Sequence, residues 1–546
     1  MGYHLSRMSD PLTEVIAYHQ ATKHHFHSYA RGPRTMDWAT QPNPFRQYEG
    51  APLIALDHVP PTTEPLYDAA SVTGHVPTLP LTHHLVSQLF SDSLALSAWK
   101  QAGDSSWALR INPSSGNLHP TEGYLICGPI AGLCAVPMVC HYSPSKHALE
   151  RRAEFPLETW QQLTQGLPKP ALLLGLTSVH WREAWKYGER AYRYCQHDAG
   201  HAIAAISLAA AAQGWQATLL DDLGTEMLAV LLGVDDSQGA EAEEPDCVLV
   251  LHPQGTSPRT HNLPGNALET FAALPWQGKP NLLSHGHVAW PIIERVTAAT
   301  KKPATNQEYE AFRPTGTPLA VGSARVSFRQ IIYQRRSAVA LDGCTSITRK
   351  AFYQILARTL AGPIPFNTLP WTPVIHLALF VHRVQNLDPG LYVLVRDPIQ
   401  TPLLRAEMKS EFVWVKPEAC PDGLEFYSLQ TGDTRRVSEQ ISCHQSISAD
   451  GCFSLGMLAE FERPLQQFGA WFYPRLYWES GVVGQVLYLE AEAIGIRGTG
   501  IGCFFDDPMH SVLGLKNLRY QSLYHFTMGG PIEDPRLRSL PPYPTA

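Results

Sequence analysis

The chain has 546 residues, of which 44% are hydrophobic and 17% are charged, a balance typical of globular proteins with large cores. Its net charge is −7 at pH 7 and it has no basic block, so we expect neither nucleic acid nor an anionic membrane as a partner. Because it has no secretory signal, no apolar run of about 18 residues and no C-x-x-C pair among its ten cysteines, we expect a cytoplasmic protein with free thiols and no membrane span.

The first concentrated group of polar residues lies in RINPSSGNLHPTEGYLI, residues 110–126. Hydroxyl, amide and guanidinium groups gather there directly before a predicted strand, EGYLI. Such a loop either holds a ligand or is a capped turn that leads into the strand. The candidate ligand-binding residues are Arg110, Ser114, Ser115, Gly116 and Asn117.

The segment WREAWKYGERAYRYCQHDAGH, residues 181–201, leads into an alanine-rich apolar helix. Lys186 and Tyr187 are the candidates for a catalytic role, and the alternative for Lys186 is a surface ion pair with Glu189 or Glu183. His197 and His201 have the four-residue spacing of metal ligands on a helix. No second pair of ligands accompanies them, so we favour packed histidines and expect no metal.

Two segments of the second half have patterns suited to an anionic ligand. IIYQRRSAVALDG places two arginines beside a serine, which could hold a phosphate or be a solvated pair at a helix end. GIRGTGIGCFFDD has glycines that let backbone N–H groups approach a ligand, or that simply turn a helix into a strand. The candidate residues are Arg335, Arg336 and Ser337 from the first segment, Gly502 and Cys503 from the second, and Arg536 further on.

The chain also repeats itself. The segments DAGHAIAAISLAAAAQGWQATLLDD and ESGVVGQVLYLEAEAIGIRGTGIGCFFDD each predict an apolar helix that ends at a glycine and continues to an Asp-Asp pair. Upstream, NLHP at 117–120 matches NTLP at 367–370, and a β-rich run follows each. MVCHYSPSKHALE and GLYVLVRDPIQTPLL come next, and each predicts a strand, a turn and the start of a helix. The pairs that align without a gap are Gly200 with Gly481, Leu208 with Leu489, and Gly214 with Gly495.

These matches predict an α+β protein made of two tandem copies, residues 1–280 and 311–546, joined by a linker at 281–310. Each copy is expected to be a mostly antiparallel sheet flanked by helices, and continuous apolar strands such as PALLLGLTSV indicate a sheet covered on both faces. Fused copies of a dimerising unit form an intramolecular pseudo-dimer, so the protein could be monomeric.

Taken together, the R-x-x-P-S-x-G loop, the K-Y-G-x-R-x-Y-R-Y segment, the RRS motif and the GIG turn resemble the FMN-dependent nitroreductase superfamily. The Lys-Tyr pair resembles its SagB-type dehydrogenase branch, which contains the thiazole and oxazole synthetase oxidases. The resemblance covers most of the chain in tandem form, and it implies a nitroreductase-like fold with FMN at the interface between the copies.

The resemblance also implies where each part of the flavin would lie. Arg335, Arg336 and Ser337 would hold the phosphate, with Arg536 as a later basic partner. Gly502 and Cys503 would present amides toward N5 and O4, while the loop at 110–117 would pack on the ring and the ribityl chain. The first copy keeps this loop but has no RRS, and the second copy keeps RRS and GIG but not the loop. One hybrid site is therefore expected, with the second site lost.

The implied chemistry is hydride transfer to or from flavin N5, with Lys186 as a base near the substrate and Tyr187 beside it. A small molecule or a peptide is the expected substrate. One alternative is a nitro or quinone reductase that takes hydride from NAD(P)H. Another is a pseudoenzyme, with or without flavin, that serves as a scaffold for peptide substrates.

Overall fold

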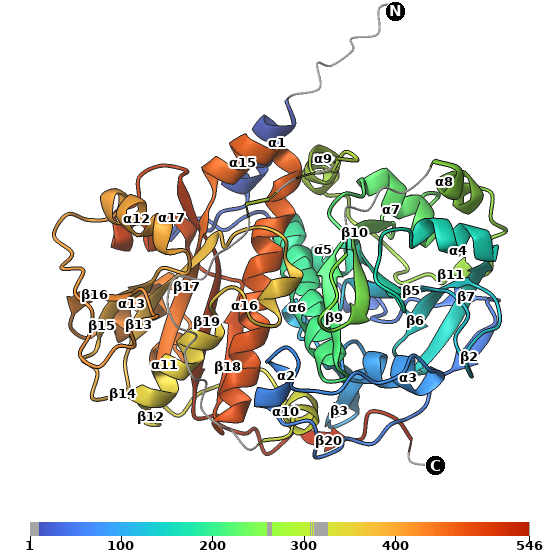
Figure 1. The fold of residues 1–546 in the computed structure, drawn as a ribbon. Coiled ribbons are helices and arrows are strands. Elements are labelled where there is room, and N and C mark those ends of the chain that lie inside the picture. Colours follow the sequence, from blue (N-terminus) through green and yellow to red (C-terminus); the bar gives the residue numbers. More distant parts are fainter. Residues whose placement is uncertain (1–9, 259–264, 306, 308, 311–325, 545–546) are drawn as a thin grey trace, which may run out of the picture.

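The computed structural model describes residues 10–258, 265–305, 307, 309–310 and 326–544. The expectation about a secretory signal concerns residues 1–9, which lie outside the described part. Figure 1 shows two sheet-containing halves on either side of a pair of long central helices. Within the described residues, no helix combines the length and apolar character needed to cross a membrane.

The first half is built on a seven-stranded sheet in which every neighbouring pair is antiparallel. Its central strands are buried along their whole length, as the continuous apolar runs predict. The strands, in sheet order, are β2 (Leu53–Ala55), β7 (Ala148–Glu154), β6 (Met138–Ser143), β5 (Thr121–Cys127), β8 (Leu172–Val179), β10 (Glu243–Pro253) and β9 (Trp215–Leu219).

The second half contains a six-stranded antiparallel sheet with the same connectivity as the first sheet without β2. In both sheets the first of these strands in the chain lies third in the sheet, between the second and the fourth. The strands, in sheet order, are β16 (Phe426–Thr431), β15 (Gly390–Leu394), β13 (Ile375–Val381), β17 (Phe453–Glu460), β19 (Tyr520–Gly529) and β18 (Arg497–Ile501).

One expected helix is a strand. After β6 the chain turns at His147, with a φ of 46°, and returns as β7 to form a hairpin with β6. The matching segment of the second half does continue into a helix, α12 (Thr401–Glu407). Most of β7 is buried, including Leu149, and the strand pairs with β6 along its whole length.

Two central helices of 21 residues, α6 (Ala191–Ala211) and α16 (Tyr473–Ala493), lie side by side between the sheets (Figure 1). They touch at Gly200 and Gly481, the pair aligned by the sequence repeat. A β-carbon on Gly200 would collide with the carbonyl oxygen of Trp478 and would lie 2.9 Å from Cα of Gly481. Two glycines at one crossing therefore allow the helix backbones to touch.

Shorter helices cover the outer faces of both sheets and the surface between them. On the first sheet, Leu231 of α7 and Phe271 of α8 lie in one apolar cluster with strand residues. On the second, Leu404 of α12 and Leu513 of α17 do the same. The remaining helices are α1 (Pro11–Ala21), α2 (Tyr67–Ala70), α3 (His83–Ser91), α4 (Leu157–Leu163), α5 (His180–Tyr187), α7 (Thr225–Leu232), α8 (Gly265–Ala272), α9 (Pro291–Ala299), α10 (Phe328–Gln334), α11 (Arg349–Arg358), α13 (Arg435–Ile441), α14 (Ile447–Asp450), α15 (Glu462–Phe468) and α17 (Asp506–Leu513).

The segment near each end of the described chain contacts the other half of the molecule. Near the N-terminus, the amide of His24 donates to Asp506 at 2.9 Å, and Lys23 pairs with Asp507 at 2.8 Å. At the other end, β20 (Arg538–Leu540) joins the first half as the edge of a small sheet with β3 (Leu96–Ala102) and β4 (Ser105–Arg110). Two further pairs are β1 (Tyr48–Glu49) with β11 (Lys279–Pro280), and β12 (Ile347–Thr348) with β14 (Val384–Gln385).

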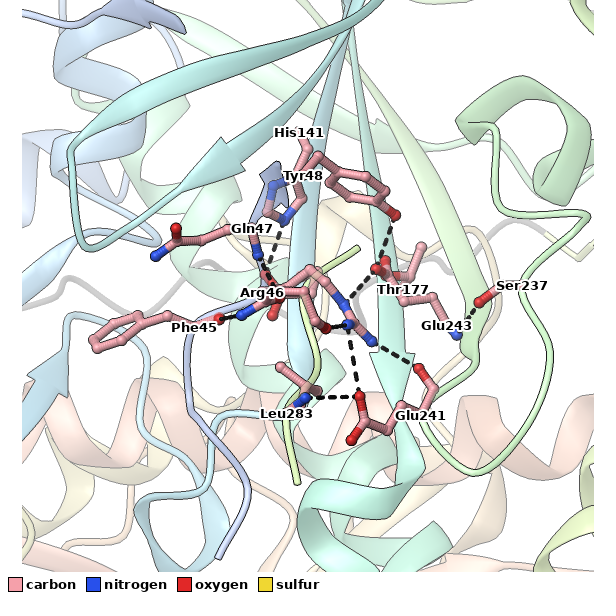
Figure 2. Close-up of polar contacts among 12 residues, drawn as sticks. Phe45, Arg46, Gln47, Tyr48, His141, Thr177, Ser237, Glu241, Glu243 and Leu283 are labelled. Atoms are coloured by element: carbon pink, nitrogen blue, oxygen red, sulfur yellow. Dashed lines mark hydrogen bonds and ion pairs between the residues drawn. The ribbon is translucent and has the colours of Figure 1, made fainter. Parts of the chain in front are cut away.

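A buried ionic network anchors the segment before β1 (Figure 2). The guanidinium of Arg46 donates to Glu243 at 3.1 Å, to the Glu241 carbonyl at 2.7 Å and to the Asn281 carbonyl at 2.6 Å. Residues 281–283, which we expected to begin a linker, are thus fixed to the first half, and the rest of 281–310 contains α9. The network also fixes Pro44, whose carbonyl accepts a hydrogen bond from Arg110 at 2.6 Å.

Candidate functional site

A cavity of about 420 Å³ lies between the two halves and is lined by both. This volume lies within the range of small-molecule sites, roughly 300–1,000 Å³. Its walls bring together the loop after β4, the residues that follow α10, and the glycine turn at the end of β18. The candidate residues that line it are Arg110, Ser114, Ser115, Gly116, Asn117, Tyr187, Arg335, Arg336, Ser337, Gly502 and Cys503.

The loop after β4 is held in shape by its own polar side chains. The backbone amide of Ser115 donates to the Asp198 carboxylate on α6 at 3.0 Å, and its hydroxyl donates at 3.1 Å. The amide of His119 donates to the Ser114 hydroxyl at 2.8 Å. Asn117 uses both ends of its side-chain amide, one on the Ala108 carbonyl and one on the His119 ring. These bonds fix the loop against α6.

Lys186 and Tyr187 lie close to this loop at Gly116. A β-carbon on Gly116 would lie 2.6 Å from the Tyr187 hydroxyl and 3.1 Å from Nζ of Lys186. Gly116 also has a φ of 58°, a conformation that favours glycine. Both the lack of space and the backbone conformation therefore require glycine here. Tyr187 lines the cavity, whereas Lys186 lies beside Gly116 and is partly exposed. Among the described residues, Lys186 forms no ion pair with the glutamates that precede and follow it.

Two buried carboxyl groups lie under the loop, and sequence reasoning did not single them out. Burial raises the pKa of Asp198 to about 7, although hydrogen bonds from Ser114 and Ser115 lower it. Burial raises the pKa of Glu183 well above its usual range, and the neighbouring charge of Asp198 raises it further. Neither carboxylate oxygen of Glu183 has a hydrogen-bond partner within the described part of the chain.

Part of the cavity wall, referred to below as its basic end, carries four cationic side chains. Lys100, Arg110, Arg335 and Arg336 line it, and within the described residues none of them forms an ion pair. Arg335 donates to the carbonyls of Arg110 and Ile111, and Arg336 donates to those of Tyr333 and Arg335. Burial lowers the pKa of Arg110 and that of Arg336 to about 10, because unpaired positive charge is costly there. Lys100 was not identified from the sequence, since it belongs to no motif.

The tyrosines of the central helices and β19 line the wall between the basic end and the glycine turn. The hydroxyl of Tyr488 is 2.9 Å from the Ser337 hydroxyl and accepts a hydrogen bond from the Gly500 amide at 2.9 Å. A β-carbon on Gly502 would collide with the ring of Tyr194. The glycines of the turn are therefore required by the tyrosines beneath them, so that the strand can lie directly on α6 and α16.

Like Lys186, the predicted site residue Arg536 does not line the cavity. Its side chain is 84% exposed and pairs with Asp534 at 2.7 Å in a local turn. The neighbouring Leu537 lines the cavity instead. We correct this assignment: the further cation at the basic end is Lys100, which β3 carries into the wall.

Buried polar atoms that lack a hydrogen-bond partner indicate which kind of ligand the cavity suits. Nε of Arg110, Oδ1 of Asn112 and Nδ1 of His119 are buried in its wall and have no hydrogen-bond partner among the described residues. Together with four cations and one carboxylate, these groups suit an anionic ligand that also carries hydrogen-bonding groups. The cavity residues fit FMN in this respect.

The position related to this cavity by the repeat is nearly filled. Glu479 occupies the place of Asp198 on α16 and accepts hydrogen bonds from the amides of Val374 and Ile375. Arg475 forms an ion pair with Asp221, in the segment that matches the glycine turn. The remaining space is about 40 Å³, roughly that of a water molecule.

Comparison with known proteins shows the fold. No family model matches the chain, and neither does any curated protein. The structure is similar to that of a provisionally named nitroreductase from Anabaena variabilis, with a TM-score of 0.68 and 22% identity over 95% of this chain and 99% of that chain. The chain therefore has a nitroreductase-like fold.

Other solved structures match a smaller share of the chain. One is the E. coli microcin synthetase McbBCD complex with truncated pro-MccB17 bound, with a TM-score of 0.28 and 17% identity over 46% of this chain and 96% of that chain. Another is a provisionally named NAD(P)H:FMN oxidoreductase from Staphylococcus epidermidis, with a TM-score of 0.20 and 14% identity over 38% of this chain and 88% of that chain.

Proposed function

We propose that the protein is an FMN-dependent oxidoreductase with one flavin site, built from both halves of a tandem duplication. The observation that carries this proposal is the cavity that gathers the PSSGN loop, the RRS motif and the GIG turn around unpaired cations. Matching sheet connectivity and the Gly200–Gly481 crossing support the duplication, with copies at 1–280 and 311–546.

The basic end of the cavity would bind the phosphate. Arg335, Arg336 and Lys100 supply the charge, and Ser337 supplies a hydroxyl beside Tyr488. Charge-assisted hydrogen bonds contribute about 1.5–3 kcal/mol each, so losing one weakens binding by about 10- to 150-fold. Arg335 also holds the Arg110 carbonyl, so it orients the loop as well as carrying charge.

The loop after β4 and the glycine turn would hold the flavin ring. FMN supplies hydride transfer at N5 when it is bound. The hydrogen bond from Ser115 to Asp198 fixes the loop, and the hydrogen bond from the Gly500 amide to Tyr488 fixes the turn. Both walls are therefore held in place before a ligand binds. This preorganisation keeps Gly502 and Cys503 at the cavity wall opposite the loop.

Lys186 would act on the substrate as a base, as the SagB-type resemblance implies. Its amine lies against Gly116, a loop residue that lines the cavity, and has no carboxylate within ion-pair distance among the described residues. Tyr187 lies beside it and lines the cavity. A peptide or small molecule with an acidic C–H group is the substrate class that this arrangement suits.

A nitro or quinone reductase is the second candidate, because Tyr187 lines the cavity and Lys186 does not. Such a reductase would take electrons from NAD(P)H and would need no base from Lys186. The two candidates share the flavin site and differ in whether activity depends on the lysine.

The experiment compares binding of FMN with binding of riboflavin, which has no phosphate, to the flavin-free protein by quenching of flavin fluorescence. We expect wild-type protein to prefer FMN and Arg336→Ala to lose about 10- to 150-fold in FMN affinity with little effect on riboflavin. Arg536→Ala is the matched control, since this arginine is exposed and away from the cavity. Equal losses for both ligands, or a loss in the control, would contradict the proposed phosphate site.

A further inference from the structure

Two cysteines from distant segments meet at the wall of the cavity. Cys443 follows α13 and Cys503 follows β18, and their Sγ atoms lie 2.8 Å apart. The two loops are tied together around them. The side-chain amide of Gln445 donates to the Cys503 carbonyl at 3.0 Å, and the Phe505 amide donates to the Ile441 carbonyl at 2.7 Å. The thiols are therefore held as a pair.

Both thiols can be reached from outside the core. Cys443 and Cys503 are partly exposed, and Cys503 lines the cavity, whereas Cys195, Cys247 and Cys452 are buried. A reagent that enters the cavity thus meets Cys503, and the Cys443 sulfur lies next to the Cys503 sulfur.

The surroundings of Cys503 favour its thiolate. The hydrogen bond with the Cys443 thiol lowers the pKa of Cys503 to about 5, and His24 and the charge of Arg190 contribute in the same direction. Arg190 is held in place by a hydrogen bond to the Gly502 carbonyl at 3.2 Å. The pKa of Cys443 is raised, because its proton is shared with Cys503 and because it is partly buried. The thiolate is the form that attacks a disulfide, so Cys503 is the nucleophile of the pair.

We propose that Cys443 and Cys503 form a thiol–disulfide exchange site that reacts with small disulfides entering the cavity. The Cys503 thiolate attacks one sulfur of the external disulfide, a new S–S bond forms, and the first external thiolate leaves. Cys443 then loses its proton and attacks the Cys503 sulfur, which breaks the mixed disulfide and releases the second external thiolate. The protein dithiol is oxidised by two electrons, the external disulfide is reduced to two thiols, and the two thiol protons pass to them.

The exchange takes no electrons from a flavin, but it uses the cavity in which FMN would bind, so it is tested on the flavin-free protein. The electrons come from the two cysteines and go to the external disulfide. Failure of the exchange would leave the proposed flavin site unaffected, and failure of flavin binding would leave the cysteine pair in place.

The test incubates flavin-free protein with glutathione disulfide, stops the reaction in acid, alkylates the remaining thiols and maps the peptides by mass spectrometry. In wild-type protein we expect a peptide linked through Cys443 and Cys503 and no stable glutathione adduct at either residue. In Cys443→Ser we expect a glutathione adduct that stays on Cys503, because the resolving thiol is absent. In Cys503→Ser we expect an adduct to form at least ten times more slowly.

A second thiol pair supplies the matched control. The Sγ atoms of Cys127 and Cys134 lie 3.9 Å apart, away from the cavity lining, with Cys127 buried. Cys134→Ser should therefore leave the Cys443–Cys503 link unchanged. The proposal is overturned if both cavity thiols of the wild-type protein stay alkylatable, or if glutathione remains on Cys503 without the internal link. Both of these outcomes are measured on the wild-type chain and need no variant to fold.

Discussion

The backbone amide and the hydroxyl of Ser115 both donate to the carboxylate of Asp198, which lies buried on the central helix α6. This contact joins the loop of the cavity to the helix that crosses the other half of the molecule. Because Asp198 is buried with a raised pKa, the contact is also sensitive to pH.

Asp198 should make the protein less stable as the pH rises. The folded chain holds this proton up to about pH 7, whereas the unfolded chain loses it near pH 3.9, so the folded state binds more protons between these values. Stability from this group is complete below about pH 4 and is lost as the pH rises through 7, by at most about 4 kcal/mol. Asp198→Asn cannot ionise, so its free energy of unfolding in urea should rise relative to that of the wild type between pH 5 and pH 8. A difference in unfolding free energy that stays constant over this pH range would refute the raised pKa of Asp198.

The crossing of α6 and α16 should tolerate no side chain at Gly200. Gly200→Ala places a methyl group against the Trp478 carbonyl, a backbone atom that cannot rotate away. We expect a loss of about 1–3 kcal/mol in the free energy of unfolding, as for other overpacked cores. Gly32→Ala is the control, because nothing lies within 4 Å of its β-carbon. Comparable denaturation midpoints for the two variants would show that the helices can separate.

The network around Arg46 should be required for stability (Figure 2). Arg46→Met leaves the buried carboxylate of Glu243 without its cation, and removing one partner of a buried pair costs about 3–5 kcal/mol. Thermal unfolding measures the effect. Arg536→Met removes an exposed arginine from its pair with Asp534 and should behave like wild type. A stable Arg46→Met variant would mean that water replaces the guanidinium.

Lys186 separates the two candidate functions. If the lysine acts as a base, Lys186→Ala should lower the rate of dehydrogenation by about 10²- to 10⁴-fold and leave reduction of a nitroaromatic compound by NAD(P)H nearly unchanged. Both rates are read from flavin absorbance under single-turnover conditions. Lys23→Ala, which removes an ion pair with Asp507 away from the cavity lining, serves as the control. Equal loss of both activities would indicate that the lysine only supports Gly116.

Much of the fold was predictable because it rests on local patterns. The apolar run before Gly214 predicted α6, and the repeat predicted a second such helix, α16. The crossing of these helices at Gly200 and Gly481 was not predicted. Continuous apolar segments predicted β8 and β13. The hairpin of β6 and β7 was missed since a short apolar alternation after a turn fits a helix start as well as a strand.

Site residues that belong to a local sequence motif were predictable, and those that the fold brings together from distant segments were not. The PSSGN loop and the RRS motif are visible in the sequence, and the structure brings them to one cavity. Lys100 belongs to no motif. Asp198 and the pair of Cys443 with Cys503 have no local signature either, because their partners come from segments 60 or more residues away. Arg536 was misplaced because a basic residue near the end of the chain shows neither its direction nor its exposure.

The number of FMN molecules bound per chain tests the central claim most directly. Purified protein would be saturated with FMN and freed of excess, and the acid-released flavin would be identified and counted from its absorbance against the protein concentration. The account predicts one FMN per chain. The cavity of about 420 Å³ is lined by the PSSGN, RRS and GIG motifs, whereas only about 40 Å³ of space remains at the position related by the repeat. Two per chain, or none after saturation, would contradict it.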